Sequence, residues 1–180
     1  VLSSKDMVKI RGMSKAFGEF KPFEVLFAGK YDVEVSMFWT NEIHDVRLKC
    51  RPDVVDFEQD IVIDIKTEGR SASPDSFSKA LMNYDYHISC ALTKAGYKAT
   101  TGRDLKAYIF AVIEVDEPHC CAAYAADSEV FELGDFYLNK YVAKYGDFLK
   151  RDHWPSYTES IHQIGLPAWG KSQLKYGDEE

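Results

Sequence analysis

The sequence lacks several features that would place the protein in a specialised class. No apolar run approaches the roughly 18 residues that a membrane-spanning helix needs, and the N-terminal stretch VLSSKDMVKIRGM has no signal-peptide architecture. The first residue is not methionine, so we expect an upstream N-terminal segment to be missing. With 180 residues, of which 46% are hydrophobic, the chain can bury one core. We therefore predict a single domain over 1–180 and no membrane partner.

Cysteine is scarce, and its positions fit neither a zinc site nor a disulfide framework. The four residues, Cys50, Cys90, Cys120 and Cys121, form no C-x-x-C pair, and two of them are adjacent. Reduced and mostly buried thiols explain this pattern, which is typical of a cytoplasmic protein.

An excess of basic residues is also absent. The formal net charge is −7, which argues mildly against a nucleic-acid partner because phosphates are neutralised by Lys and Arg. The argument is weak, since basic residues can gather on one face and a metal-dependent nuclease needs carboxylates. Composition alone leaves the function open.

Periodicity predicts an α/β class with a mixed central sheet flanked by helices. Alternating or β-branched segments indicate strands over 31–39, 46–55, 61–67, 106–116 and 119–126. Helix signals begin at Ser3-Ser4, at Ser73-Pro74 and at Ser128. The second helix is expected to break near Asn83 and to stop at Gly96, and the third to reach about Lys150.

One group of residues has the composition of a catalytic site. Side chains two apart on a strand share a face, so Asp64 and Lys66 in the strand IVIDIKT point the same way. If the preceding strand pairs with this one as a hairpin, Asp53 at the end of Arg51-Pro52-Asp53 approaches Asp64. The alternative is a solvated Asp–Lys ladder on a half-exposed strand, which is common and contributes little.

A metal ion would explain two converging carboxylates. Mg²⁺ takes oxygen ligands and keeps several waters, and Mn²⁺ suits the same ligands. We predict Asp53, Asp64, the carbonyl of Ile65 and, as an additional carboxylate, Glu34 as metal ligands. Lys66 would orient or help to deprotonate the attacking water and offset charge in the transition state. The alternative for Glu34 is a solvated residue on an edge strand.

The order of these residues resembles the PD-(D/E)xK nuclease superfamily, with Pro52-Asp53 and Asp64-Ile65-Lys66 as its signature. Their surroundings are similar to the exodeoxyribonuclease VIII (RecE) group of phages and prophages. The segments that carry this closer resemblance are Lys49-Cys50-Arg51-Pro52-Asp53, Asp64-Ile65-Lys66-Thr67, Ala72-Ser73-Pro74 with Phe77, and Tyr86-His87.

This resemblance implies a restriction-endonuclease-like core with Asp53, Asp64 and Lys66 as catalytic residues. It further implies degradation of linear double-stranded DNA from 5′ ends in recombination, a ring-shaped homo-oligomer, and cooperation with a single-strand annealing protein.

Five residues are predicted to contact DNA, either through phosphate binding or through the resemblance: Arg51, Ser73, Lys79, Tyr86 and His87. An ion pair is an equal alternative for Arg51, and a plain helix cap explains Ser73 without DNA.

Two departures from the group keep other functions open. Ser89 and Thr93 stand where related nucleases carry Gln and Tyr, and an upstream His or Glu is absent. A structure-specific endonuclease, or a degenerate fold that only binds DNA or a protein, therefore remains an alternative.

Overall fold

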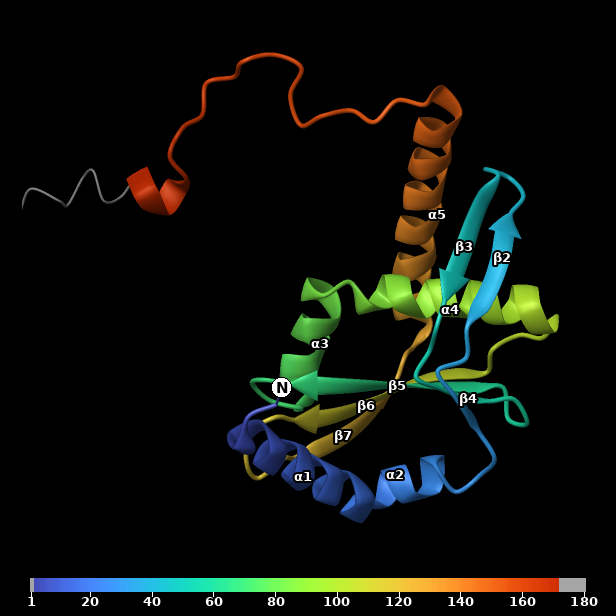
Figure 1. The fold of residues 1–180 in the computed structure, drawn as a ribbon, viewed down its shortest axis with the longest axis vertical. Helices are drawn as coiled ribbons and strands as arrows, with labels where there is room; N and C mark the ends of the chain where they lie inside the picture. Colours follow the sequence, from blue (N-terminus) through green and yellow to red (C-terminus); the bar gives the residue numbers. More distant parts are fainter. Residues whose placement is uncertain (1, 172–180) are drawn as a thin grey trace, which may run out of the picture. The chain divides into compact units, whose positions relative to one another are not determined.

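The computed structural model describes residues 2–171, and Figure 1 traces their path. The chain divides into two compact units, Val1–Asp147 and Phe148–Glu180. Every described strand belongs to the first unit, which also contains all the predicted site residues. Within the described residues, none of the helices has the length and apolar character needed to cross a membrane.

Along the described residues, two helices are followed by five strands, two more helices, two strands and a long helix. The helices are α1 (Ser4–Glu19), α2 (Lys21–Leu26), α3 (Pro74–Asn83), α4 (Tyr86–Thr101) and α5 (Ser128–Arg151). The strands are β1 (Asp32–Val33), β2 (Met37–Asn41), β3 (Val46–Cys50), β4 (Val54–Asp56), β5 (Ile61–Glu68), β6 (Ala107–Glu114) and β7 (Cys121–Ala125).

A five-stranded mixed sheet, in the order β1-β4-β5-β6-β7, forms the centre of the first unit. Strands β5 and β6 are parallel, with Asp64 beside Phe110, and the other neighbours in this sheet are antiparallel. Strands β2 and β3 form a separate antiparallel hairpin. The predicted class, a mixed central sheet flanked by helices, is thus confirmed.

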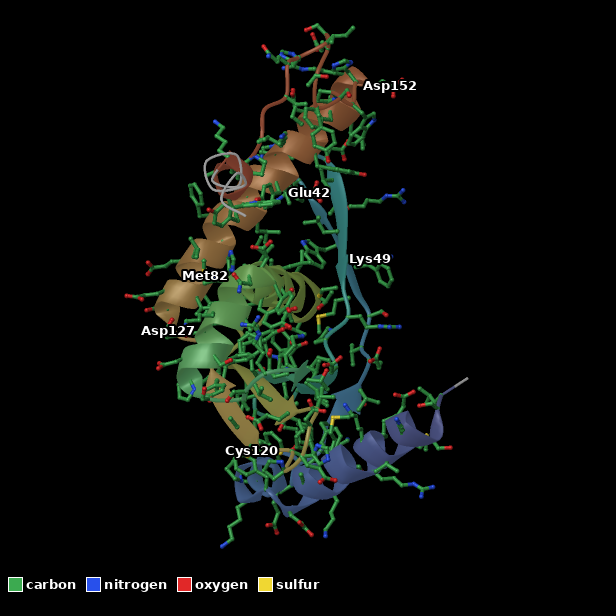
Figure 2. The ribbon with its side chains drawn as sticks, turned by 90° about the vertical axis from the view of Figure 1, so that its left-hand side faces the viewer. Glu42, Lys49, Met82, Cys120, Asp127 and Asp152 are labelled. Atoms are coloured by element: carbon green, nitrogen blue, oxygen red, sulfur yellow. The ribbon has the colours of Figure 1, made fainter. Side chains whose placement is uncertain are left out.

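Helices cover both faces of the sheet (Figures 1 and 2). One core lies on the face covered by α3 and α4 and includes Val62, Tyr108 and Phe77. The other lies beneath α1 and α2 and includes Phe23 and Ile63. Because consecutive residues of β5 alternate between these two cores, the strand has one polar site face and one largely apolar face.

The parallel pair β5–β6 requires a crossover, which α3 and α4 supply. The two helices are separated at Tyr84-Asp85, where Asp85 adopts a left-handed backbone with φ of 55°. Gly96 does not stop the helix as predicted, because α4 continues to Thr101 and ends at Gly102. A Cβ at Gly96 would lie 2.7 Å from the Trp39 ring, so this glycine allows the β2–β3 hairpin to approach α4.

Other boundaries also differ from those predicted. The segment 31–39 contains two strands, β1 and β2, and 46–55 contains β3 and β4, with each segment divided between the two sheets. Asp127, rather than Ser128, caps α5 by accepting the Val130 N–H at 3.0 Å. Ser73 precedes Pro74 at the start of α3, but its side chain makes no capping hydrogen bond.

Candidate active site

Strand β5 places three charged side chains on the face that is covered by α3 and α4. Asp64 and Glu68 are buried and Lys66 lies half-buried between them. The opposite face carries Ile63, which is buried in the second core, and Ile65, which is 37% exposed. The spacing therefore predicted the shared face of Asp64 and Lys66 correctly.

Asp53 reaches the site from the neighbouring strand. The antiparallel register pairs Val54 with Ile63, and one residue further along it brings Asp53 opposite Asp64. The Oδ2 atom of Asp53 accepts the backbone N–H of Ile65 at 2.7 Å. The predicted hairpin between the two strands thus exists and brings the two carboxylates together.

Asp64 is a buried carboxylate with few stabilising contacts. Its residue exposure is 8%, and burial raises the pKa of its carboxyl, an effect that the adjacent Lys66 ammonium opposes and the charge of Asp53 reinforces. The Lys66 Nζ contacts Asp64 Oδ2. A cation bound at Asp64 would favour the ionised form, which burial alone disfavours.

Tyr86 holds the other side of Lys66. The Lys66 ammonium lies 4.8 Å from the centroid of the Tyr86 ring, within the range of a cation–π contact. Tyr86 is the first residue of α4 and packs on Phe77 and Phe110. The ring that contacts the lysine is thus fixed by the core.

The donor set at this site fits a hard divalent cation. Asp53, Asp64 and the Ile65 carbonyl offer oxygen atoms, and Mg²⁺ accepts a small number of protein oxygens because it retains water. Within residues 2–171, no group of three or more His, Cys, Asp or Glu side chains is arranged to hold a metal ion. The arrangement is therefore unlike a closed structural metal site, in which the protein supplies every ligand.

Glu34, the fourth predicted ligand, contacts a different partner. Its Oε2 atom lies 2.7 Å from Nε of Arg51, and both side chains are more than half exposed. The Glu34 N–H donates to the carbonyl of Asp53 at 2.8 Å. Glu34 therefore supports the Asp53 backbone, and its role as a metal ligand stays a prediction.

A pocket of about 180 Å³ opens beside Asp64. Arg51 lines it together with Ser89 and Thr93 of α4, the two positions at which the resemblance implies Gln and Tyr. The predicted DNA contact Arg51 and the predicted ligand Asp64 thus share one cavity, whose lining includes the small hydroxyl side chains of Ser89 and Thr93.

The other residues predicted to contact DNA are spread along α3 and α4. Ser73, which precedes the first of these helices, and Lys79, which lies on it, are both exposed. His87 is 1% exposed, and its ring packs edge-on against Tyr137. A DNA contact by the buried His87 side chain does not fit this position, and we leave His87 out of the proposed DNA surface.

Glu68 was not predicted as a site residue, although the alternation of charged residues along β5 points to it. It continues the alternation of Asp64 and Lys66 by one more step, and it is 7% exposed. Burial raises the pKa of the Glu68 carboxyl. The same face of β5 therefore carries a second buried acid beyond the predicted motif.

The loop between β5 and α3 is fixed by two side chains from the neighbouring strands. The Ala72 N–H donates to Glu114 Oε1 at 2.8 Å, and the Tyr124 hydroxyl donates to the Ala72 carbonyl. Glu114, which stands at the end of an otherwise apolar strand, thus positions the segment that leads from Lys66 to α3.

Comparison with known proteins assigns the family. The model of the family described as PDDEXK-like domain of unknown function (DUF3799) matches residues 2–166. The chain belongs to this PDDEXK-like family. The family assignment confirms the resemblance drawn from Pro52-Asp53 and Asp64-Ile65-Lys66. No curated protein matches the chain.

Two solved structures share the fold at low sequence identity. A provisionally assigned exonuclease from Eubacterium rectale is 10% identical, with a TM-score of 0.65 over 91% of this chain. The match spans 64% of the length of that protein. A phage-related exonuclease from Haemophilus somnus 129PT is 10% identical, with a TM-score of 0.50 over 84% of this chain and 75% of its own.

Proposed function

We propose that the protein is a divalent-metal-dependent exonuclease that hydrolyses phosphodiester bonds of linear double-stranded DNA. The observation that carries this proposal is the buried Asp64, which contacts Lys66 and lies opposite Asp53 in a PDDEXK-like fold. Burial of a carboxylate without enough donors is costly, and a catalytic cation would offset that cost.

Each residue then has a distinct role. Asp53, Asp64 and the carbonyl of Ile65 would hold Mg²⁺ or Mn²⁺. The metal supplies Lewis-acid activation of the phosphodiester and lowers the pKa of a bound water. Lys66, held between Asp64 and the Tyr86 ring, would orient the attacking water and stabilise the negative charge that develops on the phosphate.

Arg51 is placed to bind the DNA backbone near the reacting phosphate. It lines the 180 Å³ pocket that Asp64 also lines, and guanidinium groups form paired hydrogen bonds with phosphate. Ser73, just before α3, and Lys79 on α3 are exposed and would contact the DNA backbone further from the reacting phosphate.

The finer aspects of the proposal follow from the resemblance to the exodeoxyribonuclease VIII group. They are degradation from 5′ ends, a role in phage-type recombination, assembly into a ring-shaped homo-oligomer, and cooperation with a single-strand annealing protein. The structural neighbour that is described as a phage-related exonuclease supports the phage-type exonuclease activity.

The test is hydrolysis of linear and covalently closed duplex DNA with Mg²⁺ or EDTA, using 5′ and 3′ end labels. Wild type is compared with Lys66→Ala and with the control Lys15→Ala on α1, whose lysine is 75% exposed. Both the 180-residue chain and any longer gene product are assayed. Metal-dependent loss of linear DNA alone, abolished only in Lys66→Ala, supports the exonuclease, and the labels give its polarity.

Other outcomes contradict the proposal in distinct ways. Cleavage of closed circles indicates a structure-specific endonuclease. A folded protein that binds DNA but hydrolyses nothing, with Mg²⁺ or with Mn²⁺ added in its place, indicates a binding function.

A further inference from the structure

A second pocket, of about 410 Å³, lies at the end of β5 against α3. This volume is within the range of about 300–1,000 Å³ that is typical of small-ligand sites. The residues that line it and bear functional groups are Glu68, Arg70, Ser76, Lys79, Asn83 and Tyr84. The pocket begins two residues beyond Lys66, which is about 7 Å along the strand.

The Glu68 carboxyl is the feature of this pocket that most needs a partner. The residue is 7% exposed, and its Oε1 atom has no hydrogen-bond partner. A buried carboxyl oxygen without a donor is unfavourable. Because the described protein supplies no donor to this atom, a ligand with an N–H group would complete the site.

The rim of the pocket carries positive charge, opposite in sign to the Glu68 carboxylate. Arg70 and Lys79 are exposed, and neither side chain forms an ion pair with any of residues 2–171. These two cations argue against a metal ion bound at Glu68, and the Glu68 carboxyl argues against a bare phosphate. The pocket instead fits a ligand that is anionic at one end and carries N–H donors at the other.

Tyr84 adds an aromatic surface to the same pocket. Its side chain is 66% exposed although it is large and apolar. Nucleobases stack on aromatic side chains of this kind. The ligand type that combines an anion, an amino group and a flat aromatic face is a nucleotide.

One end of the loop that carries Arg70 is held in place by the neighbouring strands. Glu114 and Tyr124 hold the two backbone groups of Ala72, which joins the Arg70 loop to α3. Holding this end of the loop reduces the reorganisation needed when a ligand enters, which favours selective binding.

We propose that this pocket holds an unpaired nucleotide next to the reacting phosphate, and that Glu68 selects bases with an exocyclic amino group (cytosine, adenine or guanine) over thymine and uracil. Glu68 accepts the hydrogen bond from the amino group, Tyr84 stacks on the base, and Arg70 and Lys79 bind a phosphate. Carboxylate side chains accept the cytosine amino group in this way in other DNA complexes. The inference rests on the proposed nuclease function, because it places the nucleotide beside Lys66.

The first experiment measures hydrolysis of matched DNA substrates that carry cytosine or uracil at single positions near the labelled end. We expect wild type to cleave the cytosine substrate at least about fivefold faster at one position. Glu68→Gln, which can both donate and accept, should lose most of this preference. The control Glu42→Gln, on the exposed β2–β3 turn, should keep it.

The second experiment needs no hydrolysis. Binding of dCMP and dUMP is measured in EDTA by the perturbation of backbone amide resonances. Wild type should bind dCMP at least about fivefold more tightly, Glu68→Gln should bind both alike, and Arg70→Gln with Lys79→Gln should weaken both equally. Far-UV circular dichroism and melting curves verify that each variant is folded.

The two experiments separate the failure of the inference from the failure of the proposed function. Metal-dependent hydrolysis without base preference, together with equal binding of dCMP and dUMP, overturns the role of Glu68 and leaves the nuclease intact. Absence of hydrolysis together with Glu68-dependent nucleotide selection overturns the nuclease function and retains the nucleotide pocket.

Discussion

Asp60 and Asp64 lie four residues apart in the chain, yet their surroundings differ sharply. Both residues have little exposed area, 7% and 8% respectively. Asp60 accepts from the Tyr97 hydroxyl at 2.7 Å and lies within 3.0 Å of Arg103 and Lys106 nitrogens. Those contacts, led by the Tyr97 hydrogen bond, lower the pKa of Asp60, whereas burial raises that of Asp64.

The difference lies in the donors rather than in the exposed area. Asp60 stands at the rim of the fold, where three side chains neutralise or hydrogen-bond its carboxyl, so its role is structural. Asp64 contacts the Lys66 ammonium and the Tyr108 hydroxyl, which do not offset the effect of burial on its pKa, so its carboxyl is left for a ligand to complete. Poorly satisfied buried acids are thus better candidates for function than well-paired ones.

Removal of Lys66 should give the largest effect. Lys66→Ala is expected to lower the hydrolysis rate by on the order of 10²–10³-fold, because a preorganised positive charge is lost at the reacting phosphate. Steady-state rates with labelled linear DNA test this, with far-UV circular dichroism as a check of folding. A rate within twofold of wild type would mean that the Lys66–Asp64 pair is only structural, like the ion pairs of Asp60.

Metal binding should distinguish Asp64 from Asp60 directly. At about 100 times its Kd, Mg²⁺ should stabilise the wild type by about 2.7 kcal/mol, which raises the Tm by roughly 5–10 °C for a chain of this size. Asp64→Asn should remove the effect, and the control Asp45→Asn on an exposed turn should retain it. Calorimetry with and without Mg²⁺ provides the measurement.

This metal effect should depend on pH with a definite sign. The pKa of Asp64 is raised, so the carboxyl takes up its proton at a higher pH than an ordinary aspartate. The Mg²⁺-induced rise in Tm should therefore decline as the pH falls through this raised pKa. A Mg²⁺-induced rise in Tm that persists unchanged in strong acid would indicate that the metal binds at a site without Asp64.

Asp60→Asn should affect folding and leave metal binding unchanged. Since the folded-state pKa of Asp60 is lowered from its ordinary value of 3.8, its contribution to stability is present above pH 3.8 and is lost as the pH falls through the lowered value. The variant should melt at a lower temperature than wild type near pH 7, and the gap should narrow in acid. Melting curves of wild type and Asp60→Asn at neutral and at acidic pH test this. If Asp60→Asn also lost the Mg²⁺-induced rise in Tm, the assignment of a structural role to Asp60 and a metal-binding role to Asp64 would be contradicted.

The ring of Tyr86 should have the smallest effect. Tyr86→Leu removes the cation–π contact with Lys66 and should lower kcat about two- to fivefold, whereas Tyr86→Phe keeps the ring and should keep kcat. A rise in KM at constant kcat would indicate instead the DNA contact that the sequence predicted for Tyr86. Initial-rate measurements over a range of DNA concentrations separate the two.

The sequence predicted those parts of the site that depend on local periodicity. Alternation along β5 put Asp64 and Lys66 on one face, and the hairpin with β4 brought Asp53 to them. It did not predict that Gly96 lies inside a helix, since this depends on the approach of Trp39 from a distant hairpin. The Glu68 pocket was missed for the same reason, because its walls come from a loop and a helix whose packing no local pattern reveals.

The parallel pairing of β5 with β6 has a consequence during synthesis of the protein. The residues that cover Asp64, including Tyr108 and Phe110, are on β6 and are translated more than forty positions after it. A nascent chain that ends before β6 therefore contains Asp53, Asp64 and Lys66 but not the wall that buries them. Since a parallel pair cannot form before its crossover is complete, the candidate site is buried only after the ribosome has released β6.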